Sequence, residues 1–255
     1  YFYVGQVLTH VRPNHYLAVR HVSARALNAE LGLAVDGDTV HYYWSHGGYL
    51  FYNERWDCWR LAKCSVPITG FPGTTVQQFT TDMPLQASTS NMLNLNEYAG
   101  GLSDGRSSVT AFDYAPGQVG DWFRHQGDFT NTVRALKAYF LRDGLFVFAG
   151  NSLRGGRADV WTNVEFRQIT TDVQFGRPGA ATESFSGDTD VTRTVDLDAS
   201  GTLPVWVHHE NTGYVVLAGT GTFTLQIDHS RDSYCHDYQS GLGTRAPDLI
   251  DALYM

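Results

Sequence analysis

The sequence is short of charged residues, of cysteines and of long apolar runs. Charged side chains make up 17% of the 255 residues and aromatic ones 13%, which excludes a disordered chain and argues against long solvent-exposed helices. No apolar run approaches the roughly 20 residues that cross a bilayer, so we expect no membrane span. The net charge of −8 argues against nucleic acid as a partner, because that binding requires clustered Lys and Arg. The net charge does not exclude a polyanionic sugar as a partner, since an acidic protein can bind such a sugar in a local basic groove.

The three cysteines leave the redox compartment open. One disulfide between Cys58 and Cys64 with a free thiol at Cys235 fits the count, and three buried thiols fit it as well. The chain opens on Tyr1 without a Met or a signal peptide, so we expect this start to be a cleavage product or the boundary of an excised piece.

Short strand-like runs dominate the sequence. The clearest are residues 40–44, 49–52, 145–149 and 205–207, which are rich in β-branched and aromatic residues. Turn signals such as Asp104-Gly105 separate them at short spacing. This pattern predicts an all-β fold in which antiparallel sheets pack face to face.

Three segments show helical patterns. Residues 23–35 and 130–140 carry apolar side chains at near-helical spacing. Residues 247–254 are the better candidate, because a proline at the start suits a first helical turn. The Gly-, Thr-, Ser- and Asp-rich residues 176–200 are the expected long loop or sub-domain junction, interrupted by a strand-like run at 191–197.

A set of different short sequence patterns occurs in a fixed order along most of the chain. They are His10-Val11-Arg12-Pro13 with Leu17-Ala18-Val19, Ser23-Ala24-Arg25, Gly47-Gly48-Tyr49-Leu50-Phe51-Tyr52-Asn53, Pro72-Gly73-Thr74-Thr75-Val76, Lys137-Ala138-Tyr139-Phe140, Glu165-Phe166-Arg167-Gln168, and Trp206-Val207-His208-His209 with Gly213-Tyr214. In this order the set resembles the central β region of the family 8 polysaccharide lyases, which cleave hyaluronan, chondroitin and xanthan. The resemblance implies a large antiparallel β-supersandwich over residues 1–240, followed by a tail or short helix over 241–255. It also implies a strand in place of the helix over 130–140.

The resemblance implies a reaction as well. Lyases of this family cleave a glycosidic bond by β-elimination beside a uronic acid. The carboxylate must be neutralised, a base must take the C5 proton, and an acid must protonate the leaving oxygen. The resemblance implies that the Asn, His, Tyr and Arg with these tasks lie in a helical α/α toroid. Such a toroid is outside this sequence, so we expect it as a separate domain or subunit.

The family's β region contributes mainly a Glu, followed three residues later by an Asn, on the loop after the Ser-Ser-Arg element. Here Arg25 is followed at the matching spacing by Glu30, whereas Leu33 stands at the Asn position and Asn28 lies nearby. We therefore expect Glu30, Asn28 and Arg25 to border the catalytic groove. The plainer interpretation of Glu30 is a solvated loop carboxylate, and Leu33 puts the catalytic geometry in doubt.

A second set of residues could contact the sugar. Arg55, Trp56, Trp59 and Arg60 lie together in an irregular segment, where indole rings could stack on sugars and guanidinium groups could bind acidic substituents. Ordinary packing is the alternative for both tryptophans.

No pattern predicts a metal or a cofactor. Adjacent His208 and His209 would point to opposite faces of a strand, so they cannot easily share one ion. The group of His229 with Asp232, Cys235, His236 and Asp237 lacks any known ligand spacing. We therefore expect neither a metal nor an organic cofactor.

Two functions are compatible with the sequence. The chain is either the β half of a polysaccharide lyase, or a non-catalytic structural or glycan-binding protein that kept the lyase fold. We expect an acidic polysaccharide and a toroid domain or subunit as partners. The expected location is extracellular, as a secreted protein or within a larger particle.

Overall fold

A computed structural model of the chain describes residues 5–26, 46–53, 70–78, 96–115, 133–156, 159–232 and 249–255. The chain separates into two compact units. In the described ranges, unit 1 comprises the residues up to 163, and unit 2 comprises residues 164–232 and 249–255. All regular structure in these ranges consists of strands, seventeen in number, which confirms the predicted all-β class.

The first sheet of unit 1 is an antiparallel sheet of three strands. Its strands, in spatial order, are β1 (Val7–Arg12), β2 (His15–Arg20) and β3 (Tyr49–Tyr52). Successive side chains of a strand point to opposite faces. Leu8, Leu17 and Val19 are therefore buried on one face of this sheet, while their neighbours face away.

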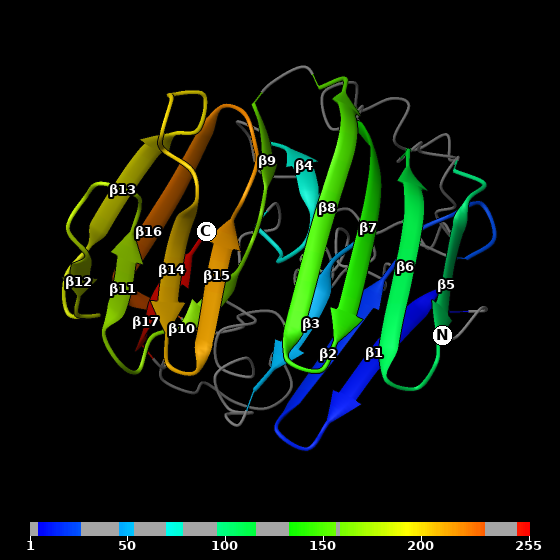
Figure 1. The fold of residues 1–255 in the computed structure, drawn as a ribbon, viewed down its shortest axis with the longest axis horizontal. Coiled ribbons are helices and arrows are strands. Elements are labelled where there is room, and N and C mark those ends of the chain that lie inside the picture. Colours follow the sequence, from blue (N-terminus) through cyan, green and yellow to red (C-terminus); the bar gives the residue numbers. More distant parts are fainter. Residues whose placement is uncertain are drawn as a thin grey trace, which may run out of the picture. The chain divides into compact units, whose positions relative to one another are not determined.

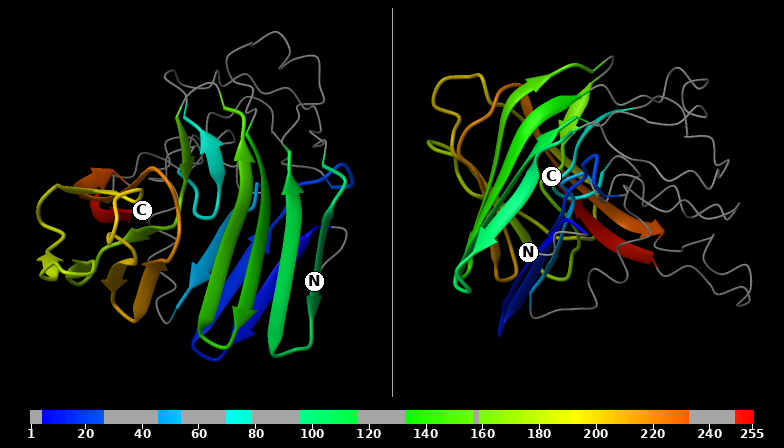
Figure 2. Two further views of the ribbon diagram at one scale, coloured as in Figure 1. Left: turned by 45° about the horizontal axis from the view of Figure 1, so that its top comes forward. Right: turned by 90° about the vertical axis from the view of Figure 1, so that its right-hand side faces the viewer.

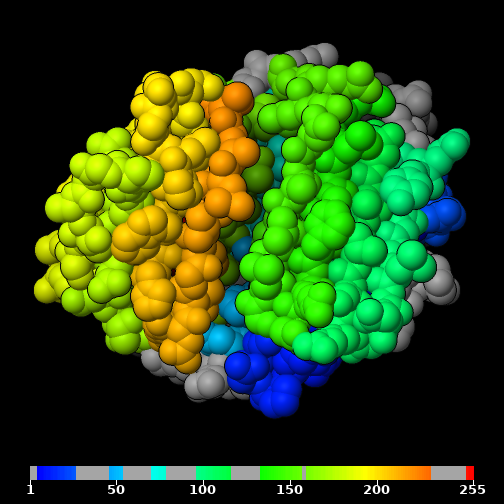
Figure 3. Space-filling view, viewed as in Figure 1, coloured from blue at the N-terminus to red at the C-terminus, as the bar shows by residue number. Residues whose placement is uncertain are grey.

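The second sheet of unit 1 is a four-stranded antiparallel meander. Its strands are β5 (Ala99–Ser103), β6 (Ser107–Tyr114), β7 (Arg134–Arg142) and β8 (Leu145–Arg154). Figure 1 shows them side by side in green, in front of the blue β1 and β2. The outward face of β7 and β8 forms part of the surface seen in Figure 3. A short antiparallel pair, β4 (Thr75–Gln77) with β9 (Val160–Thr162), completes the unit.

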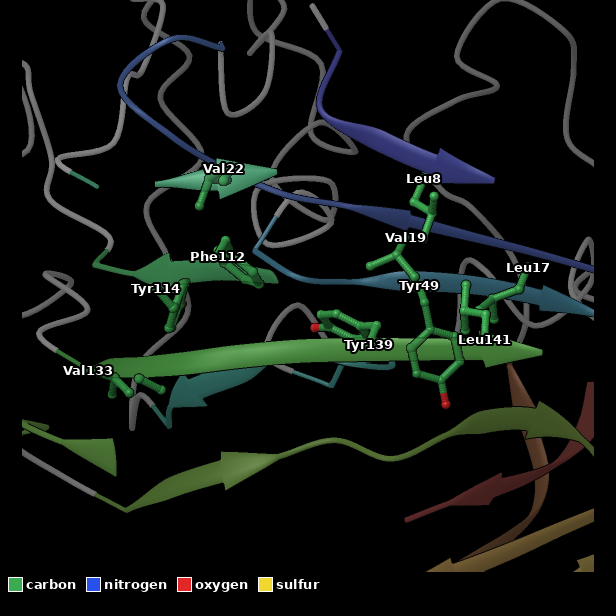
Figure 4. Packing of buried hydrophobic residues seen from close by; sticks show 12 residues of the cluster. Leu8, Leu17, Val19, Val22, Tyr49, Phe112, Tyr114, Val133, Tyr139 and Leu141 are labelled. Atoms are coloured by element: carbon green, nitrogen blue, oxygen red, sulfur yellow. The ribbon is translucent and has the colours of Figure 1, made fainter. Parts of the chain in front are cut away.

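The two large sheets of unit 1 pack face to face, as the second view of Figure 2 shows. Their shared core joins side chains from both layers and from the segments between strands, as Figure 4 shows: Leu8, Leu17, Val19, Val22, Tyr49, Ala99, Phe112, Tyr114, Val133, Ala135, Tyr139 and Leu141. Large aromatic rings make up most of the core contributed by β6 and β7, and aliphatic side chains make up most of the core contributed by β1, β2 and β3. Burial of such side chains contributes about 1.5–3 kcal/mol each and is the main force that holds the layers together.

Unit 2 contains two four-stranded sheets. One has the spatial order β10 (Phe166–Gln168), β17 (Leu249–Tyr254), β16 (Thr222–Asp232) and β13 (Val191–Asp196). The other has the order β12 (Glu183–Phe185), β11 (Val173–Gly176), β14 (Val205–His209) and β15 (Thr212–Val216). A second core that includes Val173, Phe175, Val207, Leu225 and Ile227 is shared by the two sheets.

The structure corrects the helix predictions. The helix expected over 247–254 is wrong for residues 249–254: Leu249–Tyr254 is strand β17, which pairs with β16 on one side and β10 on the other. The tail or short helix expected over 241–255 is therefore replaced by a strand in the described part, and residues 241–248 lie outside the described residues. The helical pattern of 130–140 is overridden by β7, as the resemblance implied. Of the 23–35 segment, residues 23–26 form a turn closed by a Ser23–Ala26 bridge, and the rest lies outside the described residues.

Several strand predictions are confirmed. Residues 49–52, 145–149 and 205–207 lie in β3, β8 and β14, and the run at 191–197 contains β13. The run at 40–44 lies outside the described residues. No helix in the described ranges is long and apolar enough to cross a bilayer.

Candidate functional site

Most of the predicted site residues lie outside the described residues. Glu30 and Asn28, as well as Arg55, Trp56, Trp59 and Arg60, belong to this group. Arg25 is the predicted site residue that the structure places. Arg25 lies five residues before Glu30 in the sequence, and its own surroundings are described residues.

Arg25 lies in the turn formed by residues 23–26, which we call the 23–26 turn. Its backbone N–H donates to Ser23 Oγ at 3.0 Å, and its guanidinium Nη2 donates to the Ala99 carbonyl at 2.7 Å. Ala99 is the first residue of β5. The side chain of Arg25 therefore joins the turn to the sheet of β5–β8, which is a positioning task.

Two buried amides fix the same turn. Asn96 donates from Nδ2 to the Val22 carbonyl at 2.5 Å, and its own backbone carbonyl accepts from the Ala24 N–H at 2.8 Å. Gln6 donates from Nε2 to Ser23 Oγ. The side-chain oxygens of Gln6 and Asn96 are buried and have no hydrogen-bond partner among the described residues. The turn is thus held from two sides by buried amide side chains.

Behind the turn, unit 1 contains a buried polar group that we call the lysine cluster: Lys137, Tyr139, Tyr114, His21, His46 and the carbonyls of Gly47 and Gly73. Lys137 Nζ donates to the Gly73 carbonyl and lies 5.8 Å from the centroid of the Tyr114 ring. Burial lowers the pKa of Lys137 to about 7. The amine is therefore poised between its charged and neutral forms near neutral pH.

Tyr139 holds two segments of the chain together in this cluster. Its hydroxyl donates to the Gly47 carbonyl at 2.7 Å and lies 3.4 Å from the Gly73 carbonyl. Both glycines have positive φ angles, 81° and 83°. A Cβ on Gly47 would meet Tyr139 Oη at 2.5 Å, and one on Gly73 would meet the Gly47 carbonyl at 2.6 Å. A larger residue at Gly47 would displace the buried side chains of Tyr139 and Phe112, and one at Gly73 would displace backbone; the positive φ angles favour glycine at both positions.

The histidines of the lysine cluster are neutral. His21 Nε2 shares a hydrogen bond of 2.8 Å with Thr110 Oγ1, and His46 Nδ1 shares one of 3.0 Å with the Tyr114 hydroxyl. Burial, reinforced by Lys137, lowers the pKa of each histidine to about 3. Because these rings are sealed inside the core, their geometry supports the fold and gives them no access to a substrate.

A second buried polar group, which we call the glutamate cluster, ties the two sheets of unit 2 together. Glu165 accepts from the Tyr214 hydroxyl at 3.0 Å and from the Phe166 N–H at 3.1 Å. Arg167 donates to Thr212 Oγ1 at 3.3 Å. Burial raises the pKa of Glu165, and the nearby Arg167 opposes that rise. Tyr214 and Thr212 belong to β15, so the cluster links that strand to β10.

His208, His209 and His229, the histidines of the metal hypotheses that the structure describes, lie outside the lysine cluster. His208 is exposed and His209 is fully buried, as expected for neighbours on a strand. His229 Nδ1 lies 2.8 Å from Asp251 Oδ1 and 3.1 Å from the Gly187 carbonyl, contacts that raise its pKa. Within the described ranges no three His, Cys, Asp or Glu side chains could hold one metal ion, and Cys235, His236 and Asp237 lie outside them.

The clusters were not predicted as such from the sequence. Their members were visible only as pieces of separate patterns: Lys137 and Tyr139 in one, Gly47 and Gly73 in two others, Glu165 and Arg167 in a fourth. The available signal was the period of two that places Lys137 and Tyr139 on one face of a strand. Which carbonyls they reach depends on contacts between residues more than 60 positions apart.

Comparisons with known proteins place these features in a family. Residues 1–235 match the model of the super-sandwich domain of polysaccharide lyase family 8. A solved chondroitinase AC lyase, studied with oligosaccharides, matches with a TM-score of 0.72 and 19% identity over 98% of this chain and 33% of its own. A Paenibacillus xanthan lyase matches with a TM-score of 0.69 and 17% identity over 98% of this chain and 22% of its own.

A third solved structure, the chondroitin AC lyase of Streptomyces coelicolor A3 in complex with chondroitin sulphate, matches with a TM-score of 0.59 and 18% identity. The match covers 98% of this chain and 29% of that enzyme's chain. The chain thus spans a third or less of the length of these solved enzymes. No curated protein matches its sequence.

Proposed function

Because the chain belongs to polysaccharide lyase family 8 through its super-sandwich domain, we propose that it forms the β half of a lyase that cleaves uronic-acid-containing polysaccharides by β-elimination. The family match over residues 1–235 is the observation that carries the proposal. A helical α/α toroid, on another domain or subunit, supplies the groups that act on the sugar. Secretion, with action on an extracellular glycan, is part of the same proposal.

The proposal divides the chemistry between the two halves. The toroid contributes the groups that neutralise the uronate, take the C5 proton and protonate the leaving oxygen. The β half contributes Glu30, which orients one of these groups across the groove, with Arg25 and Asn28 beside it. The 23–26 turn supports this division, because the hydrogen bonds of Gln6, Asn96 and Arg25 fix the turn that precedes Glu30 in the sequence.

A rigid loop base matters for the rate. An orienting carboxylate acts through the geometry of the transition state, and a misplacement of about 1 Å can lower turnover on the order of 10²-fold. The lysine cluster supports the same frame from within unit 1, since it holds the Gly47 and Gly73 segments against β7. In this proposal both features position groups and neither reacts.

The variant Glu30→Gln tests the role of Glu30 in the complex of this chain with the helical half of a family 8 lyase. We expect kcat to fall on the order of 10²-fold with a smaller change in KM, because the lost charge orients a group that acts in the transition state. Glu183→Gln is the matched control, since that exposed carboxylate pairs with Arg193 in unit 2. Turnover by Glu30→Gln equal to that of the control would remove Glu30 from the site.

A second candidate function is a glycan-binding or structural protein without catalysis. The observation that favours it is Leu33, which stands where the family pattern has an Asn. An apolar side chain cannot supply the hydrogen bond of an amide. If the complex binds chondroitin oligosaccharides but the unmodified chain supports no turnover, this second function is the correct one.

A further inference from the structure

The outward face of the sheet β5–β8 exposes a row of apolar and basic side chains. Along β7 the outward residues are Arg134, Leu136, Ala138, Phe140 and Arg142, which alternate with the buried members of the core. Leu136 and Phe140 are 50% and 49% exposed. Figure 3 shows β7 and β8 in green, with no described segment of unit 1 lying over them.

The register between β7 and β8 orders this face into an amphipathic track. Arg134 lies opposite Arg154, Leu136 opposite Asn151, Ala138 opposite Ala149, and Phe140 opposite Val147. The track therefore begins with two guanidinium groups, continues over a flat floor of two alanines, and reaches an aromatic ring. At the usual rise of a strand, the distance from Arg134 to Phe140 is about 20 Å, the length of a short oligosaccharide.

The two arginines at the start of the track have no partner within the described part of the chain. Like charges directly opposite each other on a sheet destabilise it. Neither guanidinium of Arg134 or Arg154 forms an ion pair or a hydrogen bond with another described residue. By contrast, Arg12 and Arg106 both lie against Asp143. An anion bound between Arg134 and Arg154 would relieve their repulsion.

The backbone beside the pair is irregular. The register of β7 and β8 shifts between Arg134 and Leu136, and Ser152 has a positive φ of 56°. Such bulges bend a strand and re-aim its side chains, and they are frequent next to binding sites. Here the bulge sets the place of Arg154 relative to the rest of the track.

The charge of the face is opposite to that of the chain. Its outward positions on β5–β8 carry three arginines (Arg134, Arg142 and Arg154) and one carboxylate, Asp113, whereas the whole chain has a net charge of −8. Guanidinium groups bind carboxylate and sulfate groups through paired hydrogen bonds. An aromatic ring offers the apolar face of a sugar a surface to stack on.

We propose that the outward face of β7 and β8 is a binding surface for acidic polysaccharide, formed by residues other than those of the cleavage site. Arg134 and Arg154 bind a carboxylate or sulfate group, and Ala138, Ala149 and Phe140 carry the sugar rings that come next along the polymer. The inference rests on the proposed function for the class of ligand, and on the two facing arginines for the site. It gives the β half a role in holding the polymer as well as in orienting Glu30.

The test measures how the full chain binds fluorescently labelled oligosaccharides of chondroitin sulfate and of hyaluronan, by fluorescence polarisation at low salt. The double variant Arg134→Gln with Arg154→Gln should weaken binding at least about tenfold, since charge-assisted hydrogen bonds contribute more than about 1.4 kcal/mol each. The control Arg106→Gln with Arg177→Gln removes the same charge from two other exposed positions and should change binding by less than about twofold. Binding of both glycans points to the carboxylate, and binding of the sulfated one alone points to sulfate.

Several results would overturn the proposal. They are an absence of binding by the unmodified chain, equal losses in both double variants, and no loss in either. A further variant, Phe140→Ser, should weaken glycan binding; if it instead leaves binding unchanged and dissociates an oligomer seen by light scattering, the face is a protein interface. Because binding is measured without the helical half, a failure here is independent of whether the complex cleaves glycans.

Discussion

At the scale of single residues, Lys137 shows how burial changes a side chain. It is 7% exposed, its amine contacts the Gly73 carbonyl and the Tyr114 ring, and the neighbouring His21 and His46 are neutral. No carboxylate hydrogen-bonds or pairs with it among the described residues. The lowered pKa of Lys137 results from this dry environment, which disfavours the ammonium form.

The pKa of Lys137 predicts a pH dependence of stability. Its pKa falls from 10.5 to about 7 on folding, so between these values the unfolded chain binds the proton and the folded chain does not. The stability contributed by Lys137 therefore rises with pH from about 7 to about 10 and is lowest below 7. Relative to Lys137→Met, the unmodified chain should gain about 2 kcal/mol in free energy of unfolding between about pH 7 and about pH 9.

Urea unfolding at a series of pH values measures that difference. Arg177→Met, an exposed change in unit 2, serves as the control and should follow the unmodified chain at every pH. Curves for Lys137→Met that run parallel to those of the unmodified chain would show that Lys137 keeps its ordinary pKa in the folded state.

At the scale of elements, the local sequence pattern predicted several strands correctly but predicted a helix for the C-terminal segment, which is a strand. β3, β8 and β14 are rich in β-branched and aromatic residues, and the sequence predicts them directly. β7 has a helical pattern but lies between β6 and β8, whose pairing decides its conformation. The segment of β17 was predicted as a helix because Pro247, just before it, suits a first helical turn. Only its pairing with β10 and β16, which are distant in sequence, reveals it.

The inner position of β17 makes the whole sheet depend on this strand. Removing residues 249–255 separates β10 from β16 and exposes Ile227 and Leu225 of the unit 2 core. Amide hydrogens of β10 and β16 should then exchange at least about tenfold faster, measured by hydrogen exchange with mass spectrometry. Strands β5–β8 of unit 1 are the internal control and should keep their protection. Unchanged protection of β16 would mean that β17 does not stabilise that sheet.

At the scale of the whole molecule, the sequence predicted the family and the fold more fully than the site. The order of short patterns was sufficient for the super-sandwich, because each pattern marks a strand or a tight turn. The lysine and glutamate clusters could not be predicted, since they form where these patterns meet in three dimensions. The positions of Glu30 and Asn28, and of the sugar-binding set Arg55, Trp56, Trp59 and Arg60, stay predictions.

The central claim is that this chain is a β half that needs a helical half for catalysis. The most direct measurement is the ultraviolet absorbance of unsaturated uronate when the purified chain is mixed with chondroitin or hyaluronan, alone and with the helical half of a family 8 lyase. The chain alone should give no product, because β-elimination needs a base, an acid and a group that neutralises the uronate in one place. The mixture should give product. Product from the chain alone would contradict the account.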